Sequence, residues 1–242
     1  MDKIKNFREL ASGLKNRDGY AIKKDKIFRS GELSKATKED IDKLIHLGIK
    51  SIYDLRSLYE QESQINHPAL KIYGFNVSQS TSRKRMDKEF LMNLANSDVD
   101  EFMVSLYRDY LAFSPVLKPL FQQIIRERKP FLFHCSAGKD RTGIVGALLM
   151  SLLDFDQESI YQEYVIIDQR ILIEAMESQR IDGLSEEIIQ KIKPLSGVKE
   201  CYIKAFYKAI LDKYETMDQY FNDFLELDER DIQSFKKYML ET

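Results

Sequence analysis

A short apolar strand, a polar glycine-containing loop and an apolar helix follow one another in the middle of the chain. Residues 131–133 (Phe-Leu-Phe) come directly after the helix-breaking Pro130 and are predicted to form a buried strand. Residues 134–143 are the polar loop, and the apolar run over 144–153 predicts a helix. This succession is the building unit of open α/β sheets, which bind ligands where their parallel strands end. The order therefore predicts an α/β fold with a functional loop at residues 134–143.

Other segments fit the same fold class. Thr37 followed by Asp40 predicts a capped helix that ends at Gly48, and a strand is expected over residues 49–55. Ser114 before Pro115 predicts the start of another helix. Further helices are expected at residues 87–112, 115–128, 157–181, 184–193, 199–214, 216–225 and 229–240. We therefore expect a central, mostly parallel sheet flanked by helices, with extra helices toward the C-terminus.

The composition is that of a globular protein. The 242 residues are 43% apolar and 31% charged, which is enough to bury one core, so a single domain over residues 1–242 is expected. Residues 168–200 are expected to form a helical cover near the functional loop. The net charge of −2 argues against a general nucleic-acid-binding protein. No apolar run is long enough to span a membrane, so no integral membrane association is expected.

Neither a metal nor a cofactor is expected. His46 and His67 lie apart in the sequence, and no cluster of Cys, His and Asp has metal-ligand spacing. The two cysteines, Cys135 and Cys201, do not make a disulfide framework, which favours a reducing compartment. The first residues also lack the apolar region of a signal peptide, so a cytoplasmic location is expected.

Cys135 is the candidate nucleophile of the loop. The thiolate, and not the thiol, attacks electrophiles. Backbone N–H groups at the N-terminus of the following helix favour an anion at this place. Thr142 provides a hydroxyl that can donate to the sulfur, and His134 can orient the loop by bonding to the backbone. These features predict an activated cysteine.

Arg141 closes the same loop. Its guanidinium can bind two oxygens of a tetrahedral oxyanion at once, which a lysine cannot do. The residues between Cys135 and Arg141 are numerous enough for their N–H groups to face inward, and several are small enough to allow close approach. The predicted phosphate-binding residues are Ser136, Ala137, Gly138, Lys139, Asp140, Arg141 and Thr142. A sulfur at the base of such a cradle is suited to displacement at phosphorus through a phosphocysteine.

Two other functions use similar parts. A catalytically silent module could bind phospho-ligands with the same loop, although binding alone does not require Cys135 together with Arg141 and Thr142. A sulfurtransferase fits poorly, because persulfide chemistry does not require this long cradle. Turnover of an aryl phosphate distinguishes an enzyme from a binding module.

The loop resembles a known family. His-Cys-Ser-Ala-Gly-Lys-Asp-Arg-Thr-Gly at 134–143 is similar to the signature of bacterial and fungal tyrosine/lipid phosphatases of the protein tyrosine phosphatase superfamily. Asn-Phe-Arg-Glu-Leu at 6–10, Phe-Arg-Ser-Gly at 28–31, Asp-Leu-Arg-Ser at 54–57 and the closing segment 214–225 also resemble it, so the likeness covers nearly the whole chain. It implies a cysteine-dependent phosphatase. The substrates implied are phosphotyrosine, with phosphoserine, phosphothreonine and phosphoinositides as further candidates.

The resemblance leaves the general acid open. The Trp-Pro-Asp loop of eukaryotic tyrosine phosphatases is missing, since the chain contains no Trp. Asp140 in the loop and Asp54 at the end of another strand are the two candidates, because a leaving oxygen needs a proton. Asp54 could equally be an ion-pair partner of Arg29 or Arg56, and Asp140 could equally brace the loop. With His134, these two arginines are the expected supporting residues.

Lys139 bears on the substrate. It adds positive charge to the cradle, and phosphoinositide phosphatases of the superfamily also carry a lysine here. Two basic clusters could line the rim, although solvated loops are the simpler interpretation. They comprise Arg83, Lys84, Arg85 and Lys88, and Lys23, Lys24 and Lys26. The expected partner is a phosphorylated protein or a phosphoinositide, with phosphate or another oxyanion in the loop.

Overall fold

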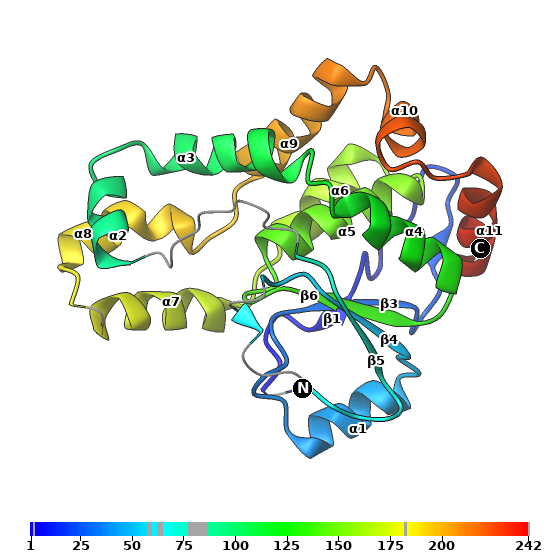
Figure 1. Cartoon of the computed structure of the whole chain (residues 1–242), viewed down its shortest axis with the longest axis horizontal. Helices are drawn as coiled ribbons and strands as arrows, with labels where there is room; N and C mark the ends of the chain where they lie inside the picture. The colour runs from blue at the N-terminus through cyan, green and yellow to red at the C-terminus, as the bar shows by residue number, and fades with distance from the viewer. Residues whose placement is uncertain (2, 58–59, 62–64, 77–86, 182, 242) are drawn as a thin grey trace.

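A five-stranded sheet forms the centre of the computed structural model, which describes residues 1, 3–57, 60, 61, 65–76, 87–181 and 183–241 (Figure 1). The strands in spatial order are β1 (Arg8–Glu9), β3 (Ile27–Ser30), β6 (Phe131–His134), β4 (Ser51–Asp54) and β5 (Lys71–Gly74). β3, β6, β4 and β5 run parallel to one another, and β1 is antiparallel to β3. The expected mostly parallel sheet is therefore confirmed. A separate small sheet pairs β2 (Ala21–Ile22) with β7 (Leu240–Glu241).

The register of the sheet brings three strand ends together. Ser30 at the end of β3 and Asp54 at the end of β4 both lie beside His134 at the end of β6. Because these strands are parallel, the segments that follow them leave the sheet at the same edge. The loop that begins at Cys135 is therefore flanked by the segments after β3 and β4.

Alternating side chains of the strands fill two apolar cores. Phe131 and Phe133 of β6 belong to the larger core, while Leu132 between them belongs to the smaller one. Helix α1 (Lys38–His46) covers the smaller core and opens with the expected capping box of Thr37 and Asp40. The larger core lies under α4 (Leu117–Glu127), α5 (Asp140–Leu152) and α6 (Gln157–Tyr164) on the other side of the sheet (Figure 1).

The remaining helices form an arm and a C-terminal layer. Figure 1 shows α2, α3, α7 and α8 projecting together from one side of the body. The elements of the arm are α2 (Lys88–Leu94), α3 (Val99–Ser105), α7 (Gln169–Ile181), α8 (Glu186–Ile192) and the short η3 (Lys193–Leu195). The π-helical turn η2 (Leu106–Leu111) follows α3 and contributes Tyr107 and Leu111 to the larger core of the body. The C-terminal layer comprises α9 (Glu200–Lys213), α10 (Met217–Gln219), the π-helical turn η4 (Tyr220–Phe224) and α11 (Glu229–Met239). No helix in the described part of the chain is long and apolar enough to cross a membrane.

Three predicted helices differ from the observed ones. The helix expected over 87–112 is divided, because the side chain of Asp98 accepts from Glu101 N–H and begins a new helix there. The helix expected to begin at Pro115 begins at Leu117, after a turn closed on the carbonyl of Ser114. The helix expected over 157–181 is interrupted between α6 and α7, where Asp168 makes reciprocal hydrogen bonds with Asn6 of the N-terminal segment (3.1 and 3.0 Å).

Candidate active site

Cys135 lies at the base of the loop between β6 and α5. Its side chain is buried, with 2% exposed, and Gly138 N–H donates to Sγ over 3.3 Å. Because α5 begins at Asp140, the sulfur lies near the positive end of the helix dipole. Thr142 Oγ1 is buried as well, and among the described residues it has no hydrogen-bond partner. The strand, loop and helix predicted around Cys135 are therefore observed, with a backbone N–H directed at the sulfur.

Gly138 allows the loop to approach the end of β3. Its φ angle is +69°, in the left-handed region that favours glycine. A Cβ at this position would lie 2.4 Å from the carbonyl oxygen of Ser30 and 2.5 Å from the nitrogen of Gly31. The turn of the loop and its contact with the sheet both depend on the missing side chain.

Two side chains from the N-terminal region hold the outward carbonyls of the loop. Asn6 Nδ2 donates to the carbonyls of Gly138 (3.0 Å) and Ala137 (3.3 Å), and Arg29 Nη2 donates to Gly138 (3.0 Å). Carbonyls held outward favour N–H groups that face the cradle. The sequence marked residues 6–10 only by resemblance and gave Asn6 no role, because a contact across 131 residues has no local signal.

Arg29 is a buried cation below the loop. Its Nη1 lies 3.2 Å from Glu163 Oε1, and this carboxylate also accepts from Arg8 Nε (3.0 Å). Burial lowers the pKa of Arg29 to about 10, with Arg8 adding to the decrease and Glu163 opposing it. Arg29 therefore stays charged at neutral pH. Its ion-pair partner is Glu163, and Asp54 lies elsewhere.

Arg141 forms a two-pronged ion pair with Glu60. Nη1 donates to Oε2 and Nη2 to Oε1, both over 2.7 Å, and Ser136 Oγ donates to Oε1 over 2.5 Å. Burial opposes ionisation of Glu60, but hydrogen bonds from Arg141 and Ser136 hold the pKa of this carboxyl well below its ordinary value. The pKa of Arg141 is raised in turn, because the pairing with Glu60 outweighs desolvation. Sequence reasoning missed Glu60, because no local pattern separates it from the many acidic residues of the surface.

Asp54 is a buried member of a different ion pair. Arg56 donates to it through Nε (3.0 Å to Oδ1) and Nη2 (2.8 Å to Oδ2). Burial raises the pKa of Asp54, but hydrogen bonds from Arg56 and the nearby His134 more than reverse this, so the pKa is lowered overall. His134 Nε2 lies 3.8 Å from Asp54 Oδ1, and its Nδ1 lies 3.2 Å from the carbonyl of Cys135. His134 thus contacts the backbone of the loop, and Asp54 is held as a carboxylate.

Asp140 lies in the loop at the first turn of α5. Its Oδ1 accepts from Tyr107 Oη over 2.8 Å, and Lys139 Nζ lies 2.9 Å from Oδ2. The Asp140 side chain keeps 25% of its surface exposed, whereas that of Asp54 keeps 2%. The two candidate acids therefore occupy contrasting environments, and Asp140 is the one within the cradle.

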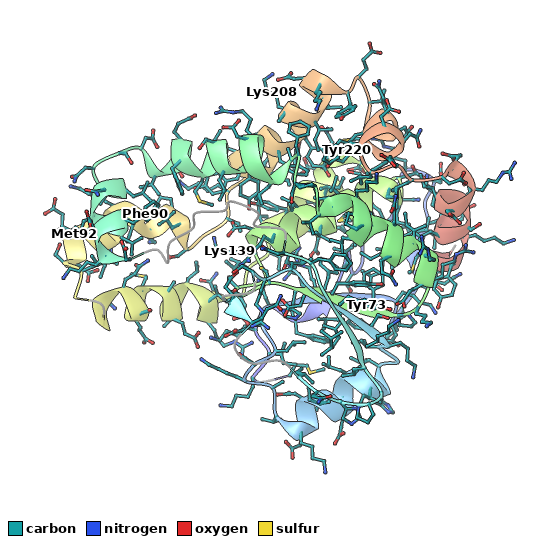
Figure 2. The ribbon with its side chains drawn as sticks, viewed as in Figure 1. Tyr73, Phe90, Met92, Lys139, Lys208 and Tyr220 are labelled. Atoms are coloured by element: carbon teal, nitrogen blue, oxygen red, sulfur yellow. The ribbon has the colours of Figure 1, made fainter. Side chains whose placement is uncertain are left out.

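Lys139 points toward the helical arm. Figure 2 shows it where the arm joins the body, at the start of α5. Besides contacting Asp140, Nζ donates to the carbonyls of Leu195 (2.7 Å) and Gly197 (3.1 Å), and 9% of the side chain is exposed. These contacts link the loop to the segment after η3. Residues 83–85 of the proposed basic rim lie outside the described residues.

Comparisons with known proteins agree on one family. A model of the tyrosine phosphatase family matches residues 1–241. A protein of Cupriavidus necator, named provisionally as a tyrosine-protein phosphatase, is 28% identical over 232 residues, covering 94% of this chain and 84% of that protein. Triple specificity protein phosphatase PtpB of Mycobacterium tuberculosis is 26% identical over 256 residues, covering 90% of each chain. The crystal structure of Pseudomonas aeruginosa TpbA aligns with a TM-score of 0.33 and 14% identity over 76% of this chain and 86% of that chain, a likeness too low to carry an argument.

Proposed function

The chain belongs to the tyrosine phosphatase family, and we propose that it hydrolyses phosphomonoesters through a phosphocysteine intermediate on Cys135. One observation carries the proposal. The buried sulfur of Cys135 accepts a hydrogen bond from Gly138 N–H at the base of a loop that ends at Arg141. This is the arrangement that a nucleophile needs below a tetrahedral oxyanion.

In the first step the Cys135 thiolate attacks phosphorus, and the S–P bond forms as the bond to the leaving oxygen breaks. The N–H groups of the loop and the Arg141 guanidinium stabilise the charge on the three equatorial oxygens. Asp140 gives its proton to the leaving oxygen. In the second step water attacks phosphorus, its proton passes to Asp140, and the S–P bond breaks. The products are the alcohol and inorganic phosphate, and the thiolate is regenerated.

We assign the general acid to Asp140 and a supporting role to Asp54. Asp54 is buried and paired with Arg56 through two donors, so it is held in the charged form that cannot give a proton. Asp140 is also paired, with Lys139, but 25% of its side chain is exposed and it stands in the loop itself, next to Arg141, where it can meet a leaving oxygen. In this scheme Asp54, Arg56 and His134 keep the end of β6 in place below Cys135.

We propose phosphotyrosine as the first substrate class, and phosphoserine, phosphothreonine and phosphoinositides as further ones. The family match supports the first class. The mycobacterial relative is named a triple specificity phosphatase, which supports a broader range. The inward turn of Lys139 toward Leu195 and Gly197 favours simple monoesters over polyanionic head groups, because its charge is already paired inside the protein.

The decisive experiment replaces the proposed nucleophile. We expect Cys135→Ser to lower turnover of 4-nitrophenyl phosphate by at least about 10³-fold, while vanadate still binds because the cradle remains. The exposed Cys201 provides a matched control, and Cys201→Ser should keep wild-type kcat/KM. Activity of Cys135→Ser within tenfold of wild type contradicts the phosphocysteine mechanism. A wild-type protein that binds vanadate but turns over no phosphotyrosine, phosphoserine or phosphoinositide substrate is a binding module instead.

A further inference from the structure

Two buried tyrosine hydroxyls lead from the larger core to Asp140. Tyr164 Oη of α6 donates to Tyr107 Oη of η2 over 2.8 Å, and Tyr107 Oη donates to Asp140 Oδ1 over 2.8 Å. The two tyrosines are 2% and 0% exposed, respectively. A hydroxyl group has one hydrogen to donate. Tyr107 accepts a hydrogen bond from Tyr164 and donates its own hydrogen to Asp140. The direction of both bonds is therefore fixed.

The rings of these tyrosines have little freedom to move. They meet edge to face with centroids 6.2 Å apart, and Tyr107 also packs against Tyr202 at 5.8 Å. A Cβ at Gly143 would lie 2.9 Å from Cε2 of Tyr164, so the Tyr164 ring occupies the space that the glycine leaves open. The glycine that follows Thr142 thus allows Tyr164 to reach Tyr107 across the first turn of α5.

The carboxyl group of Asp140 is consequently held from two sides. Tyr107 engages Oδ1 from the core, and Lys139 Nζ lies 3.2 Å from Oδ1 and 2.9 Å from Oδ2. Lys139 is itself attached to carbonyls of the helical arm, whereas Tyr107 is fixed by packed rings. Rotation of the carboxyl group would break the hydrogen bond from Tyr107, which is costly when this buried donor cannot find another acceptor.

We propose that Tyr107 is a positioning residue that orients Asp140 for proton transfer to the leaving oxygen, with Tyr164 and Gly143 holding Tyr107 in place. The proposal rests on the proposed function, because it gives Tyr107 a task in the acid step. Proton transfer requires the acid within hydrogen-bond reach and correctly directed, and small misplacements in an active site reduce rates strongly. A tyrosine that merely fills the core would affect folding and every substrate alike.

The test compares two leaving groups in Tyr107→Phe, which removes the hydroxyl and keeps the ring. Phenyl phosphate has a poor leaving group that needs the proton, and 4-nitrophenyl phosphate has a good one that does not. We expect kcat/KM, which reports only the first step, to fall about 10- to 100-fold for phenyl phosphate and less than about threefold for 4-nitrophenyl phosphate. Tyr220→Phe is the matched control, since Tyr220 is equally buried and donates to the carbonyl of Ala112 over 2.8 Å. This control variant should lower the turnover of both substrates by the same factor or leave both rates unchanged.

A double-mutant cycle determines whether Tyr107 acts through Asp140. Asp140→Asn alone should show the same dependence on the leaving group, and adding Tyr107→Phe should then change neither rate further. Tyr164→Phe, which leaves the bond from Tyr107 to Asp140 in place, should show a smaller effect in the same direction. Thermal unfolding of each variant checks that it is folded.

Each adverse outcome has a distinct meaning. Equal losses on both substrates in Tyr107→Phe, or a further loss in the double variant, overturn the positioning role. Another outcome is that Asp140→Asn lowers the turnover of both substrates by the same factor while turnover still requires Cys135. In that case the acid assignment and the positioning role both fail, but the phosphocysteine mechanism stands. If turnover does not require Cys135, the proposed function itself fails.

Discussion

Arg141 depends on Glu60 for the orientation of its guanidinium. Both terminal nitrogens of Arg141 donate to the two carboxylate oxygens at 2.7 Å, and Ser136 and Ser57 donate to the same group. A carboxylate beside the proposed phosphate site would repel phosphate, but it also fixes the plane of the arginine. Two-pronged recognition of an oxyanion requires that plane to be set before the ligand arrives. We therefore expect the orienting effect to exceed the repulsion.

Replacement of the carboxylate tests this balance at the scale of one residue. Glu60→Gln should lower kcat/KM for 4-nitrophenyl phosphate about 10- to 100-fold and weaken vanadate binding, because an amide has one acceptor oxygen for two donors. Steady-state kinetics and vanadate competition measure the two effects. Glu32→Gln is the control, since its carboxylate pairs with Arg56 at 3.2 Å and is 38% exposed. Tighter vanadate binding by Glu60→Gln would show instead that Glu60 competes with the anion.

The contact between the loop and the end of β3 belongs to the scale of the structural element. Gly138→Ala places a Cβ within 2.5 Å of backbone atoms that cannot rotate away, so the loop must leave the sheet. We expect a loss of kcat/KM of about 10²-fold or more and a lower free energy of unfolding. Gly19→Ala is the control that distinguishes the effect of the steric clash from that of backbone strain. Gly19 also has a positive φ, of +85°, but a Cβ added there would meet no atom within 4 Å. This control should cost about 1–2 kcal/mol and keep its activity. Similar activity losses in both variants would mean that the close approach of the loop is not required.

Local signals predicted most of the elements, and distant contacts explain what they missed. Adjacent residues determine the strand, loop and helix around Cys135 and the helix cap at Thr37. Both predictions were confirmed. The division at Asp98 also had a local signal, an acid at Glu101 three residues later, but the helical periodicity of residues 87–112 outweighed it. The single helix expected over residues 157–181 was wrong. Asp168 accepts from Arg170 N–H at the start of α7, and it also accepts from Asn6 of the N-terminal segment, a distant contact that has no local signal.

The candidate site follows the same division. Cys135, Asp140 and Arg141 form one contiguous motif, so the sequence alone nominated them. Their catalytic roles remain predictions that the variants above test. Glu60 and Tyr107 come from other parts of the chain, at separations of 81 and 33 residues from their partners. A tyrosine at helical spacing is indistinguishable from a core residue until the fold brings its hydroxyl to a carboxylate.

At the scale of the whole molecule, buried ionisable side chains gather below the loop at the junction of three strands. Arg29 at β3, Asp54 at β4 and His134 at β6 are 1%, 1% and 2% exposed. Buried charges stabilise a fold only when each has its partner, and here Glu163 and Arg56 provide two of them. Within the part of the chain that the structure describes, the imidazole of His134 has no carboxylate as close as these partners, since that of Asp54 lies 3.8 Å away. It is therefore the member of this group whose protonation the fold opposes.

Stability should consequently decline in mild acid. Burial lowers the pKa of His134 below its ordinary value of 6.5; Asp54 and Glu32 oppose this, and Arg56 adds to it. The unfolded chain then binds a proton at this position below about pH 6.5 while the folded chain does not, so the stability that is complete above that pH is lost as the pH falls toward the folded pKa. One group gives a slope of at most about 1.4 kcal/mol per pH unit. The carboxyls of Asp54 and Glu60, whose pKa values are lowered, add their losses only in stronger acid, below their ordinary values of 3.8 and 4.5.

Urea unfolding at about pH 7, 6 and 5 measures this dependence. We expect His134→Asn, which retains an N–H group near the carbonyl of Cys135, to be less stable than wild type at pH 7 because Asn fills less of the buried site. Its free energy of unfolding should nevertheless fall less steeply between pH 7 and pH 5, since it carries no imidazole to protonate in the unfolded chain. His46→Asn, at an exposed position in α1, should keep the wild-type slope. If His134→Asn loses stability as steeply as wild type, the acid sensitivity arises from other groups, and the buried imidazole is not what the fold protects from protonation.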